Sequence, residues 1–428
     1  MSDREPVRLW RHLDFRRLWI GETVSQFGTM ISQLALPLVA ILVVHASTFQ
    51  VGLLSAFQTV AFAVISLPVG AWVERMRFRH VLIAGDLVRA AALASIPVTR
   101  LAGALTIWQL YAVALVTGVS TVFFDVAYQS YLPLLIGRAQ LVDGNAKLQA
   151  SESVSQLAGP SVGGLLIQVL TAPFAVLIDA ASFLWSAAWV TAIRSREPKP
   201  ERTPDRHLRR EIGDGLRFVV GNPMLRAIAI CTGSSNLFSS MSMAVFYVLL
   251  ARDLHVSPGL IGLITSASAL GGLTGALVAA RFARRAGQGP AIWISVAVTE
   301  PLSFVTPFVR HDWTLVLLAV AMTAVSFGGV VYNITQVSFR QGLCPLTLLG
   351  RMNATMRFLV WGTLPVGSLL GGVLGTAIGV RETLFVAAAG GSLAFLPVFL
   401  SPLRRMRELP SYAAPAEASA AAAGTSIG

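Results

Sequence analysis

Glu22 begins a row of polar side chains inside an otherwise apolar stretch. Gln26, Thr29 and Gln33 follow it at spacings of 4, 3 and 4 residues, which puts all four side chains on one face of a helix. Inserting a charged side chain into the bilayer centre costs about 2.5 to 3.5 kcal/mol on insertion scales. Such a residue is therefore first considered as part of a functional site. An acid in such a place can take up and release a proton. Glu22 is therefore our first candidate for a proton carrier, and the alternative is an ion pair with Arg16 or Arg17.

Other charged residues also fall within apolar stretches. Asp125 and Glu300 are further candidates for carrying a proton. Asp86 and Arg89 lie three residues apart, a spacing at which helical neighbours can pair, so we interpret them as an internal ion pair. For Asp179 we expect a structural hydrogen bond.

Several kinds of chemistry are excluded by what the sequence lacks. The six histidines all fall in expected loops or tails, so no histidine relay crosses a membrane; they are His12, His45, His80, His207, His255 and His311. The chain has no Walker A sequence, no paired-cysteine metal site and no His-Glu-x-x-His pattern. We therefore expect no enzyme, no ATP-driven pump, no metal site and no cofactor. An ion gradient must then supply the energy, and the carboxylates make protons the leading choice.

The elements that must position these residues are membrane helices. Of the 428 residues, 54% are hydrophobic and 13% are charged, and the mean hydropathy is +0.68, which is too apolar for a soluble domain. Runs of about 20 apolar residues can cross about 30 Å of hydrocarbon as helices. We predict twelve such helices, over residues 18–44, 51–73, 81–99, 105–127, 148–171, 174–193, 225–249, 258–280, 290–309, 314–336, 356–379 and 383–401.

The basic residues predict the orientation of these helices, because Lys and Arg in short loops stay on the cytoplasmic side. With both termini inside, 28 basic residues fall in inside segments and four in outside loops, the four being Arg100, Arg252, Arg310 and Arg381. We therefore expect cytoplasmic N and C termini. The net charge of +12 is spread over one membrane face, so we expect no binding to nucleic acid.

A repeat divides the chain into two parts. Gly159, Gly163 and Gly164 return 208 residues later as Gly367, Gly371 and Gly372, and Val51-Gly52-Leu53 returns as Ile261-Gly262-Leu263. Parallel six-helix repeats of this kind are common in secondary transporters. We predict a cytoplasmic tail over 1–17, a six-helix half over 18–194, a cytoplasmic linker over 195–224 with an amphipathic segment from Leu208 to Val220, a second half over 225–403 and a disordered cytoplasmic tail over 404–428.

These features resemble the major facilitator superfamily. The segment GPSVGG in the fifth apolar stretch is similar to the Gly-Pro-x-x-Gly-Gly motif of its proton-coupled exporters. GAWVERMRF is similar to the Gly-x-x-x-Asp-Arg-x-Gly-Arg motif between helices two and three, although Glu74 replaces the aspartate and Arg77 the second glycine. FRRLWIGETVSQFG, LIDAASFLWSA, GLRFVV and GRMNATMRF resemble the branch of enterobactin, macrolide and tetracycline exporters, over about Leu9 to Leu403.

The resemblance implies roles for particular residues. It implies a central cavity lined by helices one, four, seven and ten, with the candidate residues Glu22, Gln26, Thr29, Gln33, Asp125, Asn236, Tyr247, Tyr332 and Asn333. It implies a conformational lock at Gly70, Glu74 and Arg75, and a hinge at Gly159, Pro160, Gly163 and Gly164. Pro160 frees a backbone carbonyl, which favours a hinge. Glycines also let helices approach closely, so a plain packing interface is the alternative to the hinge.

The sequence thus predicts a multi-pass, monomeric protein of the bacterial cytoplasmic (inner) membrane. We expect it to export amphiphilic small molecules, drugs or siderophore-like compounds, in exchange for protons by alternating access. Its expected partners are the lipid bilayer, the small-molecule substrate and protons. An uncoupled facilitator or importer on the same fold, and a non-transporting receptor, are the alternatives.

Overall fold

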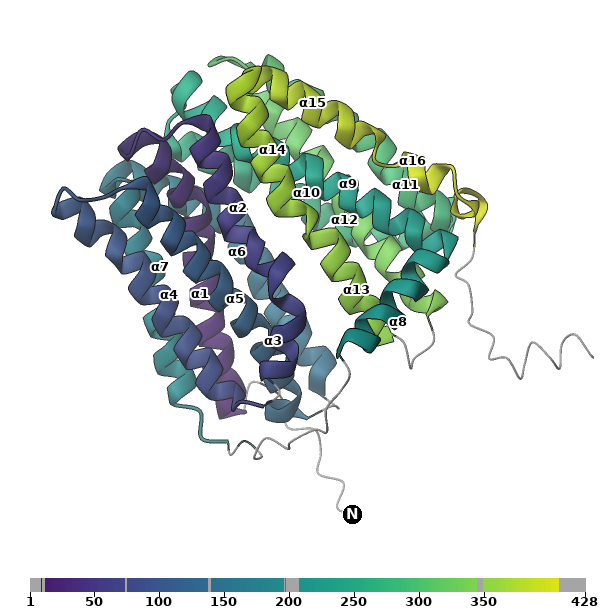
Figure 1. Ribbon diagram of the computed structural model, residues 1–428, viewed down its shortest axis with the longest axis horizontal. Coiled ribbons are helices and arrows are strands. Elements are labelled where there is room, and N and C mark those ends of the chain that lie inside the picture. The colour runs from purple at the N-terminus through teal and green to yellow at the C-terminus, as the bar shows by residue number, and fades with distance from the viewer. Residues whose placement is uncertain are drawn as a thin grey trace, which may run out of the picture.

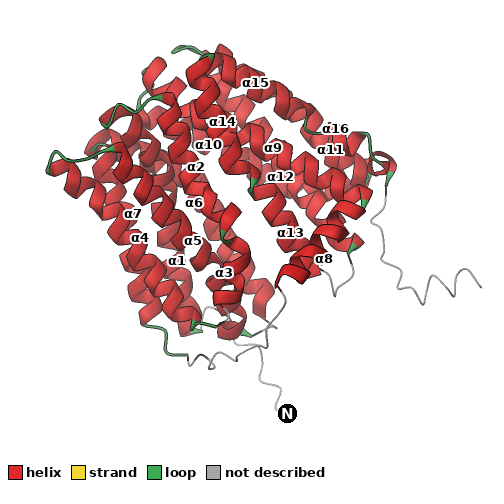
Figure 2. Cartoon of the chain, in the orientation of Figure 1, coloured by secondary structure: helices red, strands yellow, loops and turns green. Residues whose placement is uncertain are grey.

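The computed structural model is helical throughout the residues that it describes. Those residues are 9, 12–73, 75–137, 140–195, 197, 208–344 and 349–407. Figure 2 shows helices joined by short loops, and no strand among them. Glu74, residues 196 and 198–207 of the predicted linker, and most of both predicted tails lie outside the described residues. Within the described part, eleven helical segments are long and apolar enough to cross a membrane, so the chain is an all-helical protein with many candidate membrane spans.

The first part of the chain supplies the helices coloured purple to teal in Figure 1. Helix α1 spans Leu13–Leu38 and continues into a π-helical segment, η2, over Val39–Val43. The elements that follow are α2 (Thr48–Val64), α3 (Ser66–Val73), α4 (Phe78–Leu101), α5 (Ile107–Ile136), α6 (Leu141–Leu170) and α7 (Ala172–Thr191). Helix α1 packs against α6 and α7, and α4 packs against α5 and α7.

The second part begins with α8 (Leu208–Gly221), the helix predicted as an amphipathic segment of the linker. It packs against α9 and α13. The elements after α8 are α9 (Pro223–Tyr247), η4 (Val248–Asp253), α10 (Pro258–Ala286), α11 (Gln288–Thr299), η5 (Glu300–Phe308), α12 (Thr314–Leu343), α13 (Leu349–Trp361), α14 (Thr363–Ala377), α15 (Val380–Leu393), α16 (Leu396–Phe399) and η6 (Pro402–Arg405). In Figure 1 these helices lie on the opposite side of the molecule from α4 and α7.

The second predicted span differs from a simple membrane helix. It is divided into α2, which has 17 residues, and α3, with Ile65 between them. Pro68 explains the break, because a proline ring clashes with the carbonyl four residues earlier, here that of Val64. By itself α2 is shorter than the other candidate spans. The prediction of a single helix over residues 51–73 was therefore wrong.

The ninth and eleventh predicted spans are also interrupted. Helix α11 ends at Thr299, and the chain continues as the 3₁₀ helix η5, which contains Pro301 and Pro307. Helices α13 and α14 meet at Gly362. A change from α to 3₁₀ geometry inside a span often marks a hinge or a functional site, and here it begins at Glu300.

The sequence repeat has a counterpart in the backbone. The π-helical segments η2 and η4 follow α1 and α9, and each is followed by a histidine with positive φ, 55° at His45 and 54° at His255. Positive φ is uncommon in residues other than glycine. Ser47 and Ser257 then cap α2 and α10 by accepting hydrogen bonds from the backbone N–H groups of Gln50 and Leu260. Related turns thus begin α2 and α10.

Two helix crossings join the first and second parts of the chain at one end, which we call the far end because α1 runs toward it. There α2 packs against α14, and α6 packs against α10. A Cβ atom on Gly52 would lie 2.6 Å from Cα of Gly372, and one on Gly262 would lie 3.2 Å from Cα of Gly164. The glycines of the repeat therefore pair crosswise, because only a residue without a side chain permits backbones to come this close.

The largest cluster of buried apolar side chains lies at the same end. It includes Val39, Ala40 and Ile41 of η2 and residues of η4, together with Ile31, Ile167 and Ile261. Arg252 of η4 donates hydrogen bonds to the carbonyl of Ala46 and, at 2.8 Å, to the hydroxyl of Thr48. The far end is thus held closed by packing and by hydrogen bonds between elements more than 200 residues apart.

Candidate functional site

A cavity of about 1010 Å³ lies between the two sets of helices. One wall comes from α1, α4, α5 and α6, and the other from α9, α11, η5, α12 and α13. Its lining includes residues at the beginning of α13 and the end of α12, namely Asn353, Arg357 and Arg340. These positions lie toward the end at which α1 begins, which we call the near end. The cavity therefore extends toward the near end, while helix packing fills the far end.

Seven of the nine predicted cavity residues lie in its wall. They are Glu22, Gln26 and Thr29 on α1, Asp125 on α5, Asn236 on α9, and Tyr332 and Asn333 on α12. Gln33 and Tyr247 are not among the lining residues. Gln33 lies beyond the cavity, where α1 enters the far-end cluster, and its side chain is exposed. Tyr247 is buried in that cluster against the ring of Phe246, with ring centroids 5.5 Å apart.

Glu22 faces the cavity and forms no ion pair with any of the described residues, although Arg89 lines the same cavity. Gln26 donates a hydrogen bond of 3.2 Å to Oε1 of Glu22, and Oε2 is buried with no protein partner. Arg17, the residue that could have neutralised it, forms an ion pair of 2.7 Å with Asp14 instead, and Arg16 is exposed. A carboxyl group held in this way is available to a proton or to a ligand in the cavity.

Asp86 and Arg89 form the predicted ion pair, with 2.6 Å between Oδ1 and Nη2. Both side chains are buried, at 0% and 5% exposure. The guanidinium carbon of Arg89 also lies over the rings of Phe124 and Phe183, 4.3 and 4.1 Å from their centroids. Such cation–π contacts stabilise a cation removed from water. Arg89 also lines the cavity. The interpretation of Asp86 and Arg89 as an internal ion pair did not predict this position.

Asp179 makes the kind of structural hydrogen bond that we expected. The hydroxyl of Ser182 lies 3.1 Å from Oδ1 of Asp179 and also donates to the Asp179 carbonyl. A Cβ atom on Gly28 would collide with both side chains, so the glycine at this position of α1 makes room for them.

The wall formed by the second part of the chain is built from hydrogen-bonded polar residues. Tyr332 and Thr232 join α12 to α9 through their hydroxyls, which are 2.5 Å apart. Asn236 donates to the carbonyl of Val360 on α13 at 3.1 Å, and Gln336 donates to Asn333 at the same distance. These bonds fix the side chains, while Oε1 of Gln336 has no protein partner.

Several charged residues of the cavity were not among the predicted site residues. Glu152 on α6, Arg340 on α12 and Arg357 on α13 all line it. The signal was available, because Glu152 and Gln156 are four residues apart, and Asn333, Gln336 and Arg340 follow at spacings of 3 and 4. These are the same helical spacings that identified Glu22. The first wall thus carries the acids Glu22, Asp125 and Glu152 together with Arg89, and the second carries two arginines and Glu300.

The predicted hinge lies in α6, which remains helical through Pro160. Its glycines face two neighbours. A Cβ atom on Gly163 would lie 3.2 Å from Cα of Ile31 on α1, and one on Gly164 would lie 3.1 Å from Cα of Gly259 on α10. Gly159 faces Met30 in the same way. The segment is thus a close-packed crossing of α6 with both helices, and its bending stays a prediction.

Only part of the predicted lock can be located. Gly70 lies in α3 with no neighbouring atom within 4 Å of an added Cβ, and Arg75 is exposed in the turn after it. Glu74 lies outside the described residues. The structure adds Glu197 at this end, whose carboxylate accepts from the backbone N–H of Phe78 at the start of α4, and Arg79, which donates to the carbonyl of Val190 at the end of α7. These contacts tie α4 to α7.

The arrangement can hold a polar or charged small molecule between two walls of opposite character. Among the described residues, no group of three or more His, Cys, Asp and Glu side chains is placed to hold a metal ion.

The sequence matches the family model described as transmembrane secretion effector, over residues 6–422. The chain belongs to this family of the major facilitator superfamily.

Curated relatives of this superfamily member cover most of its length. The multidrug efflux pump Tap of Mycolicibacterium fortuitum is 29% identical over 384 residues, which is 85% of this chain and 90% of Tap. The macrolide efflux protein A of Streptococcus pyogenes is 23% identical over 88% of this chain and 93% of its own length. The enterobactin exporter EntS of Escherichia coli is 23% identical over 93% of this chain and 94% of its own length.

Solved structures of superfamily transporters share the fold. The inward-facing crystal structure of a bacterial homologue of the iron transporter ferroportin has a TM-score of 0.72 and 15% identity, and it covers 90% of this chain and 98% of its own. At this identity the similarity concerns the fold alone. Family and structural neighbours are membrane transporters.

Proposed function

We propose that this protein is a secondary active transporter that exports amphiphilic small molecules in exchange for protons. The observation that carries the proposal is the polar cavity, which extends toward the near end, is closed at the far end and contains the Glu22 carboxyl, which forms no ion pair with any of the described residues. The names of the relatives, which describe multidrug, macrolide and enterobactin export, support the transporter class and the range of its substrates.

We further propose that the chain crosses the bacterial inner membrane twelve times as two six-helix halves. In this arrangement α2 and α3 together form the second span, residues 18–194 and 225–403 form the halves, and 195–224 connects them. The near end and both termini then face the cytoplasm, as the bias of basic residues requires. The conformation would be inward-facing, and the protein would work as a monomer.

Transport follows from exchanging which end of the cavity is open. With the near end open, Glu22 releases its proton to the cytoplasm as a substrate enters from the cytoplasm or the inner leaflet. With the far end open, the substrate leaves and the acid takes a proton from outside, which returns inward in the next exchange. The α6 crossing would bend, and Gly70, Glu74 and Arg75 would hold the near end closed. Asp125 and Glu300 are the other candidate proton carriers.

The cavity suits a substrate with both apolar and polar parts. Drug-sized ligands bind in pockets of about 300 to 1,000 Å³ that have few polar groups. The cavity reaches the upper end of this range. Its lining combines Phe124, Met356 and Trp361 with carboxylates and amides, so large amphiphilic molecules with an ionisable or hydrogen-bonding group fit it best.

The first experiment tests Glu22 directly. The protein is reconstituted in lipid vesicles, and efflux of a fluorescent amphiphilic dye is measured under an imposed pH gradient. For Glu22→Gln we expect gradient-driven efflux to fall to the rate of protein-free vesicles while equilibrium dye binding persists, because the amide cannot carry a proton. Glu382→Gln, which removes an exposed acid of α15, serves as the matched control and should transport normally.

Other outcomes direct the choice between the alternatives. Unchanged gradient-driven efflux by Glu22→Gln would remove Glu22 as the carrier and leave Asp125 and Glu300. Transport by the native protein that ignores the pH gradient would indicate a facilitator. Binding without any transport would indicate a receptor.

A further inference from the structure

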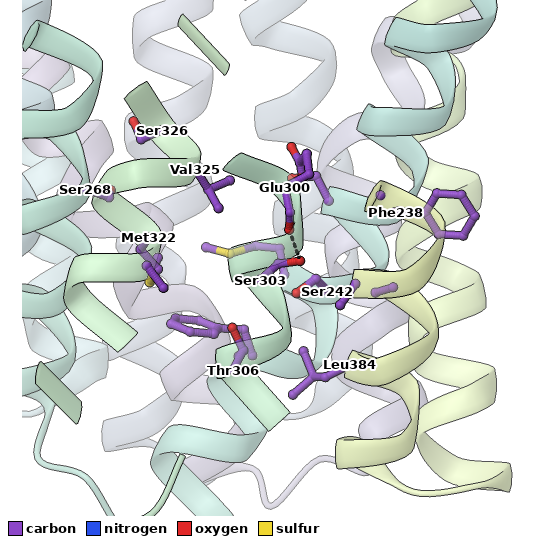
Figure 3. Close-up of a pocket in the computed structure, with 17 residues that line it drawn as sticks. Phe238, Ser242, Ser268, Glu300, Ser303, Thr306, Met322, Val325, Ser326 and Leu384 are labelled. Atoms are coloured by element: carbon purple, nitrogen blue, oxygen red, sulfur yellow. Dashed lines mark hydrogen bonds between the residues drawn. The ribbon is translucent and has the colours of Figure 1, made fainter. Parts of the chain in front are cut away.

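A second cavity, of about 250 Å³, lies inside the second part of the chain. It is lined by residues of α9, α10, η5, α12 and α15 (Figure 3). Glu300, Ser239 and Val325 line this side pocket and also line the central cavity. The two cavities therefore adjoin at these three residues.

Glu300 is placed at the mouth of the side pocket by the interruption of its helix. It is the first residue of η5, directly after α11, and Pro301 follows it. Oε2 of Glu300 would lie 3.2 Å from a Cβ atom on Gly391 of α15, so the absence of a side chain at Gly391 leaves room for the carboxyl. Interrupted helices in transporters often bind ions or substrates where their helical geometry changes.

The lining of the side pocket combines one carboxyl group with hydroxyl and apolar side chains. Glu300 is the only ionisable side chain among the described residues that line it, and none of these forms an ion pair with it. The remaining lining is of two kinds, small hydroxyl side chains such as Ser242 and Thr306, and soft apolar ones such as Met322 and Phe246. Figure 3 shows Glu300 facing the pocket between Val325 and Ser303.

A carboxylate in an apolar setting without a protein cation calls for a positive charge from elsewhere. Methionine sulfur and aromatic rings are favourable neighbours for a substituted ammonium group, whose own surface is largely apolar. A pocket of about 250 Å³ is below the roughly 300 to 1,000 Å³ of drug-sized sites, so it accommodates a head group and not a whole drug.

We propose that the side pocket is a distinct subsite that takes the ammonium-bearing end of a monovalent organic cation, with Glu300 as its counter-ion. The body of a larger cation would remain in the central cavity. This inference describes one part of the exported molecule, and to that extent it rests on the proposed export function. Binding to the subsite can be measured at equilibrium and does not require proton coupling.

The test uses the full chain in lipid nanodiscs and radiolabelled benzyltrimethylammonium, a cation small enough for the side pocket, in equilibrium dialysis without any gradient. We expect saturable binding by the native protein and a loss of affinity of about tenfold or more in Glu300→Gln. Ala388→Leu, which fills the pocket from α15 without changing its charge, should weaken binding similarly. The uncharged carbon analogue 2,2-dimethylpropylbenzene should not compete for the site.

Two comparisons separate this subsite from the central cavity. Ala388→Leu alters a residue that lines only the side pocket, and Glu382→Gln, at an exposed acid that lines neither cavity, should bind the cation with the native affinity. The proposal is overturned if Glu300→Gln keeps the native affinity, or if Ala388→Leu binds normally, since the cation would then lie on the central side of Glu300. Because binding is measured without transport, a failure of proton-driven efflux leaves this result intact, and a failure of binding leaves the efflux result intact.

Discussion

Arg89 brings a full positive charge into the first wall of the cavity, and three side chains hold it there. Asp86 pairs with it at 2.6 Å, and its guanidinium carbon lies over the rings of Phe124 and Phe183. Removing one partner of a buried ion pair leaves the other charge uncompensated. Losing either charge alone should therefore destabilise the first set of helices more than losing both.

We predict that Arg89→Met destabilises the protein by about 3 to 5 kcal/mol, because Asp86 remains fully buried without its partner. The double variant Asp86→Leu with Arg89→Met should recover most of this loss, since it buries no charge. Denaturant titration in detergent micelles, followed by circular dichroism, measures both. If the double variant is as unstable as the single one, packing against the rings and not the ion pair accounts for the effect.

The residues of the cavity illustrate what side-chain spacing can predict. The 4-and-3 spacing on α1 correctly grouped Glu22, Gln26 and Thr29 on one face, and the structure places all three in the wall. It could not indicate where along the helix the cavity ends, so Gln33 was included although it lies beside the far-end packing. Glu152 and Arg357 fall inside the predicted helices over 148–171 and 356–379, but the sequence alone does not show that these parts of the two helices reach the cavity.

At the scale of elements, the glycines identify which helices cross. Gly52 and Gly262 occupy related positions in the repeat, as do Gly164 and Gly372, and the contacts join Gly52 to Gly372 and Gly262 to Gly164. The sequence revealed the repeat but not this crosswise pairing, because pairing depends on how α2 meets α14 and α6 meets α10. The breaks at Ile65 and Thr299 were likewise missed, although Pro68 and Pro301 lie just after them.

We predict that Gly52→Val forces α2 away from α14. Even a single added carbon would come within 2.6 to 2.8 Å of the backbone of Gly372 and Ser368, so the crossing cannot remain as it is. The far end should then open in a larger share of molecules. Spin labels on the exposed far-end loop residues Ala104, between α4 and α5, and His311, between η5 and α12, would report this in pulsed electron paramagnetic resonance as a population at longer distance.

Gly221→Ala provides the control for this measurement, because an added Cβ at Gly221 meets nothing within 4 Å. Its distance distribution should match that of the native protein. An unchanged distance distribution in Gly52→Val would show that α2 and α14 can separate locally without opening the far end. The crossing of α2 with α14 would then not be what keeps the far end closed.

At the scale of the whole molecule, the charges of the two walls differ toward the near end. Glu152 lies on α6 of the first wall, and Arg340 and Arg357 lie on α12 and α13 of the second. Within the described lining residues no ion pair crosses the cavity in this conformation. If the near end closes during transport, these charges approach one another, and opposite charges then stabilise the closed state while like charges oppose it.

We predict that Glu152→Arg slows dye efflux by about tenfold or more, because facing like charges cost several kcal/mol when they are brought together. Reversing both charges, with Glu152→Arg and Arg357→Glu in one chain, should restore most of the rate. Arg285→Glu changes an exposed charge near the same end of α10 and should leave efflux unaffected. A double variant as slow as Glu152→Arg alone would mean that these two side chains do not meet, and that closure of the near end relies on other contacts between the walls.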